Sequence, residues 1–283
     1  MALFLLATAA MAAEPYVSEG FVEIPGAVRL GAMSAVDVDA KGNVYILHRG
    51  EPPLLAFNDK GKMVNAFGDG MFQVAHGLRV GPDGNIWTTD NGRHVIRKFS
   101  PQGELLATYG LESTPGAGET LFRSPDDLVF ASNGDIYVAD AGNGRIVHLK
   151  ADGSYVGEWG KKGKGESEFA AAHGIAIDKQ DRIYVADRGN NRIQVFSPEG
   201  KFLGAWGGFG NPFGALVVGD VLLVSDGDAN KINHLSLKDG KLVAQWGDAQ
   251  TLQLPHLMAT AADGRLFVAE VNGNRVQIFR RVK

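Results

Sequence analysis

Apolar and polar residues alternate in short runs along this chain, and turn residues interrupt the runs about every 8 to 12 positions. Residues 183–187 read Ile-Tyr-Val-Ala-Asp and residues 192–196 read Arg-Ile-Gln-Val-Phe, with a Gly/Asn-containing turn between them. Alternation with a period of two is typical of half-buried β-strands. Many short, evenly spaced strands of this kind predict an all-β fold.

One pattern recurs six times along the chain. Each unit contains a strand, a turn with Asp or Gly, an apolar second strand, a further turn, a third strand and, in five units, a closing aromatic-Gly pair. The central residues of the second strands are Tyr45, Trp87, Tyr137, Tyr184, Leu223 and Phe267, at intervals of 39 to 50 residues. Six repeats of four short strands predict a six-bladed β-propeller, because radial repetition protects the sheet edges.

The two ends of the chain complement each other in this pattern. The sixth unit runs out after its third strand, at residues 275–279, whereas the strand-like residues 20–25 precede the first unit and belong to none. We therefore predict that an N-terminal strand closes the last blade. Residues 16–283 are expected to form this single domain, and we expect a monomer.

Composition narrows the possible functions. The 283 residues carry a net charge of −4 without a basic block, which argues against nucleic acid as a partner. Cysteine is absent, so disulfides and thiolate metal sites are excluded, and His and carboxylates remain as zinc ligands. The apolar residues 1–12 end in Ala-Met-Ala and predict a signal peptide, hence export to the periplasm or the exterior. No later stretch is apolar enough to span a membrane.

Three histidines share one register. His76, His173 and His256 each lie 11 residues before the central residue of units two, four and six, at the start of the first strand. First strands line the axis of a propeller, and alternate blades of six are about 120° apart, so the imidazoles should converge. Three His ligands with an open fourth position form a catalytic zinc site, which we favour over three unrelated histidines that satisfy backbone groups.

Charged residues at the ends of the second strands should face the same end of the ring. Arg49 and Arg188 occupy this position in units one and four, and two guanidiniums beside a metal suit a carboxylate substrate. Their alternative role is to cap turns or face solvent. His48 stands where the other units have an acid, so it is a candidate proton acceptor, although capping the turn is the favoured role. The corresponding acids are Asp90, Asp140, Asp187, Asp226 and Glu270.

The turn sequences add a family resemblance. Residues 140–146, 187–193 and 270–276 resemble the NHL repeat, and the likeness covers about residues 30–283. The histidine and arginine set resembles one NHL enzyme family, the peptidyl-α-hydroxyglycine α-amidating lyases. His76, His173 and His256 fall where that family places its zinc ligands, and Arg49 and Arg188 fall where it has functional arginines. The resemblance implies a zinc-dependent lyase that cleaves a C–N bond of a hydroxyglycine-type substrate.

Two departures from that family concern its site. The family carries a catalytic tyrosine in the turn of the third unit, whereas residues 140–145 here read Asp-Ala-Gly-Asn-Gly-Arg. The family also holds calcium partly through an acid after the third zinc histidine, and Leu257 stands there in this chain. A carbonyl near Leu78 could still contribute a calcium ligand, but the absence of the acid argues against a calcium site.

Three functions follow from these observations. The first is an exported zinc lyase acting on a small molecule or peptide C terminus that bears a carboxylate. The second is a non-catalytic NHL propeller that binds a peptide, sugar or protein partner in the cell envelope. The third is a metal-dependent lactonase, whose usual carboxylate ligands are not evident in this sequence.

Overall fold

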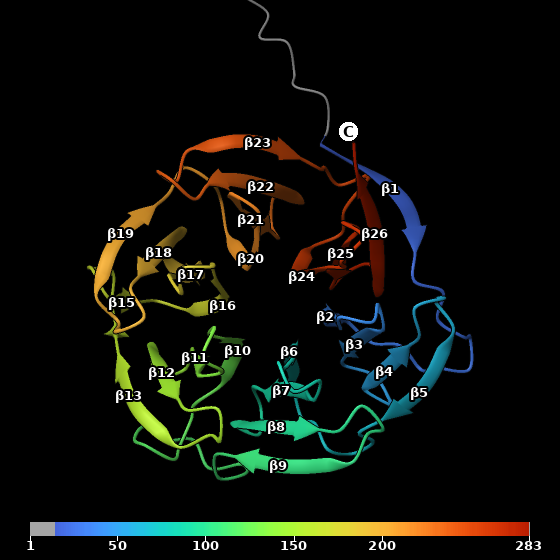
Figure 1. Ribbon diagram of the computed structural model, residues 1–283, viewed down its shortest axis with the longest axis horizontal. Helices are drawn as coiled ribbons and strands as arrows, with labels where there is room; N and C mark the ends of the chain where they lie inside the picture. The colour runs from blue at the N-terminus through green and yellow to red at the C-terminus, as the bar shows by residue number, and fades with distance from the viewer. Residues whose placement is uncertain (1–14, 283) are drawn as a thin grey trace, which may run out of the picture.

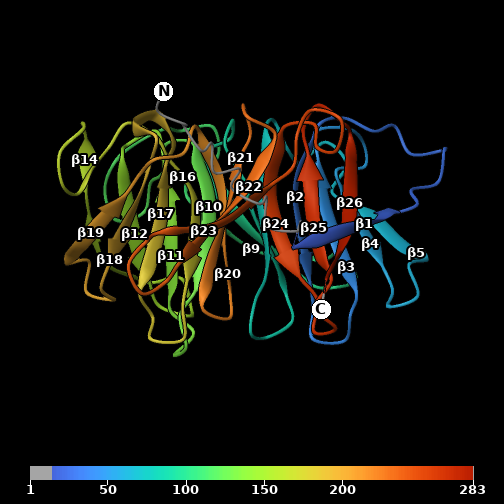
Figure 2. The same cartoon turned by 90° about the horizontal axis from the view of Figure 1, so that it is seen from above.

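Six antiparallel sheets of four strands surround a common axis. The computed structural model of the protein describes residues 15–282, and the expected signal peptide, residues 1–12, lies outside the described residues. Figure 1 shows the six sheets arranged radially, with one strand of each next to the axis, and Figure 2 shows the ring from its side. The predicted six-bladed β-propeller is confirmed.

The strands occupy equivalent places in each blade. The innermost strands are β2 (Met33–Val38), β6 (Ala75–Val80), β10 (Pro125–Phe130), β16 (Ala172–Ile177), β20 (Pro212–Val218) and β24 (Pro255–Thr260). The second strands are β3 (Val44–His48), β7 (Ile86–Asp90), β11 (Ile136–Asp140), β17 (Ile183–Asp187), β21 (Val221–Asp226) and β25 (Leu266–Glu270). Each second strand contains the central residue that the repeat pattern identified.

The outer strands complete the blades. The third strands are β4 (Leu54–Phe57), β8 (Val95–Phe99), β12 (Arg145–Leu149), β18 (Arg192–Phe196), β22 (Lys231–Ser236) and β26 (Arg275–Arg281). The outermost strands are β5 (Met63–Phe67), β9 (Leu105–Tyr109), β13 (Tyr155–Trp159), β19 (Phe202–Trp206), β23 (Leu242–Trp246) and β1 (Tyr16–Phe21). The short strands β14 (Lys161–Lys162) and β15 (Glu168–Phe169) and the 3-10 helix η1 (Arg188–Asn190) lie in connections.

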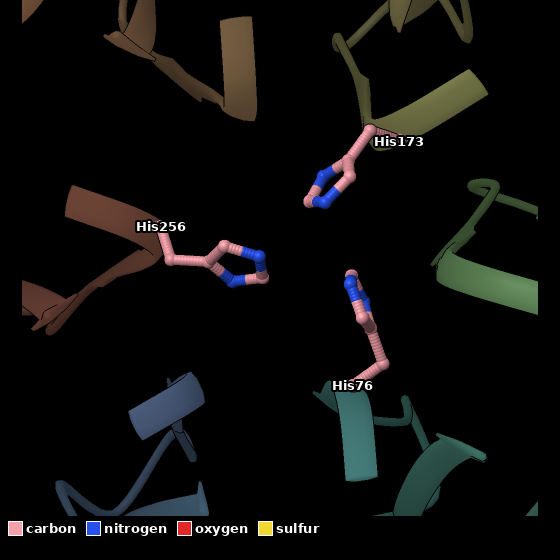
Figure 3. A group of neighbouring side chains, drawn as sticks. All are labelled: His76, His173 and His256. Atoms are coloured by element: carbon pink, nitrogen blue, oxygen red, sulfur yellow. The ribbon is translucent and has the colours of Figure 1, made fainter. Parts of the chain in front are cut away.

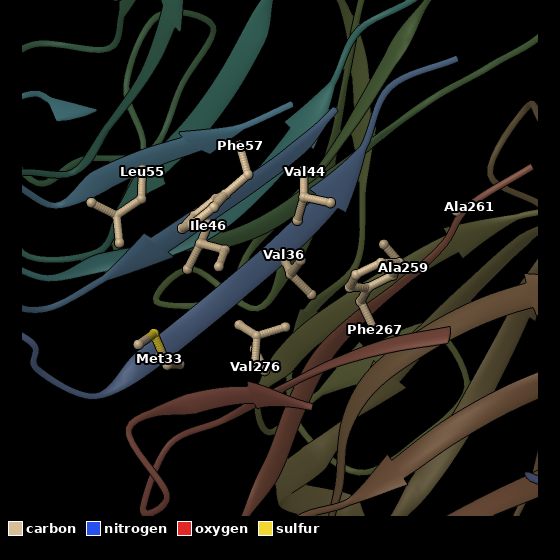
Figure 4. Close-up of a cluster of buried hydrophobic side chains, with 11 residues drawn as sticks. Met33, Val36, Val44, Ile46, Leu55, Phe57, Ala259, Ala261, Phe267 and Val276 are labelled. Atoms are coloured by element: carbon tan, nitrogen blue, oxygen red, sulfur yellow. The ribbon is translucent and has the colours of Figure 1, made fainter. Parts of the chain in front are cut away.

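The hydrophobic core lies between neighbouring blades. Figure 4 shows the cluster in which side chains of the first and last blades meet. Ile46 and Phe57 come from blade one, and Phe267 and Val276 come from blade six, and all four are buried. Burial of these faces against each other is what holds the two ends of the ring together.

The N-terminal strand closes blade six, as predicted. β1 pairs antiparallel with β26, with Tyr16 opposite Arg281 and Phe21 opposite Gln277, and Figure 1 shows the two strands side by side. The paired segment is residues 16–21, earlier in the chain than the predicted residues 20–25. Buried Tyr16 also stacks on Trp246, with ring centroids 5.5 Å apart. The strand therefore contributes packing between blades five and six as well as hydrogen bonds.

Within residues 15–282, no helix has the length and apolar character required to cross a bilayer.

Deletion of residues 16–28 should destabilise the fold far more than removal of residues 1–15. The deletion removes β1, exposes the edge of β26 and takes the Tyr16 ring away from Trp246. We expect the Tm to fall by about 10 °C or more, because loss of one buried aromatic side chain alone costs about 3–5 kcal/mol. Thermal unfolding of both truncated proteins measures this, and equal Tm values would show that the ring closes without β1.

Candidate metal and substrate site

The three histidines that share a register meet at the axis. His76 lies on β6, His173 on β16 and His256 on β24, and all three are buried. One ring nitrogen from each lies within 4.8 Å of the corresponding nitrogens of the other two. Their ring centroids are 4.7 to 5.0 Å apart, and Figure 3 shows the rings pointing toward a common centre. The convergence predicted from the repeat register is confirmed.

Each imidazole is held by the innermost strand of the next blade. The Nδ1–H group of His76 donates to the carbonyl of Asp126 (2.8 Å), and that of His173 donates to the carbonyl of Phe213 (2.8 Å). The Nδ1–H group of His256 donates to the carbonyl of Ser34 (2.5 Å). A carbonyl can only accept, so the proton is on Nδ1 and the lone pair of Nε2 is free.

Two glycines make this close approach possible. Gly77 and Gly174 follow His76 and His173, and a Cβ atom on either would lie 2.6 Å from the carbonyl oxygen that the preceding histidine contacts. Real side chains do not tolerate such a distance, so the His-Gly pair allows the strands of adjacent blades to come together. The third histidine is followed by Leu257, which is buried in the apolar cluster between blades one and two.

Electrostatics favours neutral imidazoles at the axis. Burial, with Arg49 and Arg188 acting in the same direction, lowers the pKa of His76 to about 3. Burial, followed by the other imidazoles and Arg188, holds the pKa of His173 well below its usual value; burial and His76 do the same for His256. Neutral imidazole is the form that binds a metal. Buried His173 Nε2 has no hydrogen-bond partner among the described residues, and this unsatisfied acceptor fits a metal ligand.

The two predicted arginines lie near the histidines. Arg49 directly follows β3, and its Nε donates to the carbonyl of Ala75, the residue before His76 (3.3 Å). Arg188 begins η1 and its guanidinium lies over the ring of Phe213, 4.7 Å from the ring centroid. That ring in turn contacts the imidazole of His173 at a centroid distance of 5.2 Å. The structure therefore brings both cations to the end of the ring where the imidazoles lie.

An aspartate at the same end was not assigned a role from sequence. Asp126 lies on β10, and it is only 5% exposed. Its Oδ1 accepts a hydrogen bond from Asn91 Nδ2 and lies 3.9 Å from His76 Nε2. Burial raises the pKa of Asp126 to about 8, while Arg188 and Asn91 act in the opposite direction. The sequence signal that could have identified Asp126 is its position in the repeat, which is the same as that of the three histidines.

His48 occupies the turn-capping position. Its Nδ1 accepts hydrogen bonds from the backbone N–H groups of Gly31 (3.2 Å) and Gly50 (3.0 Å). Asp90 performs the same task in blade two, where its carboxylate accepts from the N–H groups of Gln73 and Val74. Because Nδ1 of His48 accepts, its proton is on Nε2, and burial lowers its pKa. Its role as a proton acceptor stays a prediction.

A second buried charged layer lies further along the innermost strands. Arg79 Nη2 donates to Asp127 Oδ2 (2.6 Å), which also accepts from the N–H group of Ile175 in blade four (3.2 Å). Asp37 Oδ2 accepts from the N–H group of Val80 in blade two (2.8 Å). Burial raises the pKa of Asp127 to about 6, with Arg79 opposing the shift. These contacts tie the innermost strands of successive blades together and support the histidine layer.

Comparison with known proteins supports the repeat assignment. The NHL repeat model matches residues 72–99, 122–149 and 169–196. The chain is 32% identical to peptidyl-alpha-hydroxyglycine alpha-amidating lyase 1 of Drosophila melanogaster over 163 residues, 47% of this chain and 30% of that protein. It is 30% identical to peptidyl-glycine alpha-amidating monooxygenase of Mus musculus over 183 residues, 54% of this chain and 18% of that protein. The chain thus spans less than a third of the length of these relatives.

Solved structures share the fold at low sequence identity. A streptogramin B lyase superposes with a TM-score of 0.71 at 16% identity, covering 94% of this chain and 98% of the other. A gluconolactonase from Xanthomonas campestris superposes with a TM-score of 0.68 at 18% identity, covering 96% of this chain and 99% of the other. At these identities the comparison supports the propeller fold alone.

Metal affinity should change little between pH 7.5 and pH 5.5. Three ordinary imidazoles with pKa values of about 6.5 would lose about 10³-fold in affinity over this range through competition with protons. The pKa of His76 is lowered to about 3 and those of His173 and His256 lie well below the ordinary value, so all three imidazoles stay neutral over this pH range. Zinc titration against a competing chelator at both pH values measures this. A thousandfold loss at pH 5.5 would show that the imidazoles titrate as if solvated.

Proposed function

We propose, from the premise that this chain is an NHL-repeat β-propeller resembling the peptidyl-α-hydroxyglycine α-amidating lyases, that it is a zinc-dependent lyase. Its substrate would be a hydroxyglycine-type compound with a free carboxylate, either a small molecule or a peptide C terminus. The observation that carries the proposal is the set of three neutral imidazoles, oriented by backbone carbonyls and flanked by two arginines.

The three histidines would hold the metal through Nε2. Zinc prefers imidazole nitrogen, and three protein ligands leave a fourth position open for substrate or water. A bound zinc ion supplies a Lewis acid that polarises the substrate hydroxyl oxygen. The carbonyls of Asp126, Phe213 and Ser34 would keep the three rings oriented for this task.

The arginines would bind and orient the substrate carboxylate. Within residues 15–282, no carboxylate lies within 4.0 Å of the Arg188 or Arg49 side-chain nitrogens, so neither cation is neutralised by an ion pair. Planar guanidinium groups bind carboxylates through paired hydrogen bonds. Fixing the carboxylate would place the adjacent carbon and its hydroxyl next to the histidines.

The proposed reaction redistributes one proton and two electron pairs. The substrate hydroxyl loses its proton, the O–H electron pair forms a C=O bond, and the C–N bond breaks with its pair going to nitrogen. Nitrogen then takes up a proton, which yields an amide and an aldehyde acid such as glyoxylate. Proton transfer needs an acceptor near the hydroxyl, since the chain has no tyrosine in the blade-three turn.

A direct test combines metal analysis with turnover. We expect the purified protein to bind about one zinc ion and to convert N-benzoyl-α-hydroxyglycine to benzamide and glyoxylate. The His173→Ala variant should lose most of its bound zinc and most of its turnover, because two imidazoles make a much weaker metal site. His148→Ala is the matched control, since His148 lies outside the axis and pairs with Asp135. Stoichiometric zinc without turnover would favour a non-catalytic binding propeller, and zinc retained by the His173 variant would contradict the proposed site.

His48→Gln should separate capping from proton transfer. Gln offers an amide oxygen to the backbone N–H groups of Gly31 and Gly50, so the turn can remain capped. Since Nδ1 of His48 is already engaged, we expect turnover within about threefold of wild type and unchanged zinc content. Steady-state kinetics with the same substrate measures this, and a loss of about 10²-fold or more would establish His48 as the proton acceptor.

A further inference from the structure

Asp126 places a buried carboxyl group beside the candidate metal site. Among residues 15–282, Asn91 is the one side chain that donates a hydrogen bond to it, and neither Arg49 nor Arg188 forms an ion pair with it. A carboxylate that is 5% exposed normally has its acceptor capacity filled by several donors. Asp126 therefore retains capacity to accept a hydrogen bond at the end of the ring where the histidines lie.

The carboxylate lies next to the histidine site without belonging to it. Its Oδ1 is 3.9 Å from His76 Nε2, but Asp126 is not among the groups that lie within 4.8 Å of all the others. Two ligands of one zinc ion are at most about 4.2 Å apart, because each lies about 2.1 Å from the metal. The 3.9 Å between Asp126 Oδ1 and His76 Nε2 is within this limit, so the carboxyl oxygen can reach the fourth coordination position. The Asp126 carboxylate is thus positioned to contact whatever occupies the open fourth position.

The equivalent residues of the other odd-numbered blades offer no such acceptor. In blade one, Ser34 Oγ donates to the carbonyl of Ala75 (2.7 Å). In blade five, Phe213 packs against His173 and lies beneath the Arg188 guanidinium. All three residues use their backbone carbonyl to hold a histidine, so the side chain of Asp126 is free for another task. The site is therefore asymmetric, with an acceptor on the blade-three side.

We propose that Asp126 determines specificity by accepting a hydrogen bond from a hydroxyl on the carbon next to the ligand carboxylate. The site then selects α-hydroxy carboxylates over carboxylates without that hydroxyl. The inference rests on the proposed use of Arg49 and Arg188 to bind a carboxylate. A ligand hydroxyl that donates to Asp126 fills the unused acceptor capacity of a buried group, whereas a ligand without the hydroxyl leaves that group unsatisfied.

Two stable ligands that differ only in the hydroxyl test this inference. Mandelate carries an α-hydroxyl, phenylacetate does not, and neither contains a C–N bond. Calorimetric titration of the zinc-loaded protein should give about tenfold or greater preference for mandelate. Asp126→Leu, which removes both acceptor oxygens at similar volume, should bring this ratio close to one by weakening mandelate binding, with phenylacetate binding within about twofold of wild type. A general disturbance of the site would weaken both ligands together.

Controls keep the test independent of folding and of metal loss. Asp152→Asn changes an exposed aspartate in the same blade and should leave the ratio as in wild type. Asp126→Ser removes the carboxylate as well, retains the backbone carbonyl that holds His76, and places in blade three the residue type found at position 34. Circular dichroism and elemental analysis establish that each variant is folded and holds zinc.

The outcomes separate this inference from the proposed lyase function. A wild-type protein without preference for mandelate, or a preference that survives in both folded Asp126 variants, would overturn the role of Asp126. Absence of N-benzoyl-α-hydroxyglycine turnover together with an Asp126-dependent mandelate preference would refute the lyase function and leave the specificity role intact. Turnover of that substrate, together with a mandelate preference that does not change in the Asp126 variants, would support the lyase function and refute the specificity role.

Discussion

The hydrogen bond from each axial imidazole to a backbone carbonyl of the next blade is the interaction on which the site depends. It fixes the proton on Nδ1, turns the free Nε2 lone pair away from the strand, and joins blade two to three, four to five and six to one. Such a bond forms only where the innermost strands lie close together, which requires the closed ring and, in two blades, a glycine after the histidine. The geometry of the histidine site therefore depends on the closed ring of blades.

Charge at the end of the ring follows from that arrangement. Because the imidazoles are buried and neutral, Arg49 and Arg188 can lie near them without repulsion from three additional cations. A bound divalent ion would add further positive charge, so this end of the ring suits an anionic ligand. Asp126 adds a buried hydrogen-bond acceptor to this environment, and this acceptor can discriminate between anionic ligands with and without a hydroxyl group.

Periodicity along the chain was sufficient to predict the blades, the closing strand and the histidine register. Equivalent positions in successive repeats lie at equivalent depths in the ring. Three histidines that each lie 11 residues before the centre of a second strand therefore converge at the axis. The boundaries of β1 were less predictable, because residues 16–25 are strand-like throughout and only the pairing with β26 selects residues 16–21. The alternation of apolar and polar residues also did not predict that Arg79 is buried beside Asp127, since a charged residue on an alternating strand is usually solvated.

The properties that depend on neighbours in space could not be obtained from residue spacing. His48 and the three axial histidines are all buried, yet their protonated nitrogens differ because His48 faces amide N–H groups and the others face carbonyls. Asp126 shares the register of the histidines, but its role depends on whether a hydrogen-bond donor from another blade satisfies its carboxyl group. Such partners come from segments tens of residues away, which a single sequence does not pair.

Anomalous diffraction at the zinc edge, from crystals of the zinc-loaded protein, tests the central claim most directly. We predict one peak on the ring axis, about 2.0–2.1 Å from the Nε2 atoms of His76, His173 and His256, with each Nδ1 still hydrogen-bonded to its carbonyl. A peak bound by fewer than three of these imidazoles, or a metal coordinated through Nδ1 with the carbonyl contacts broken, would contradict it.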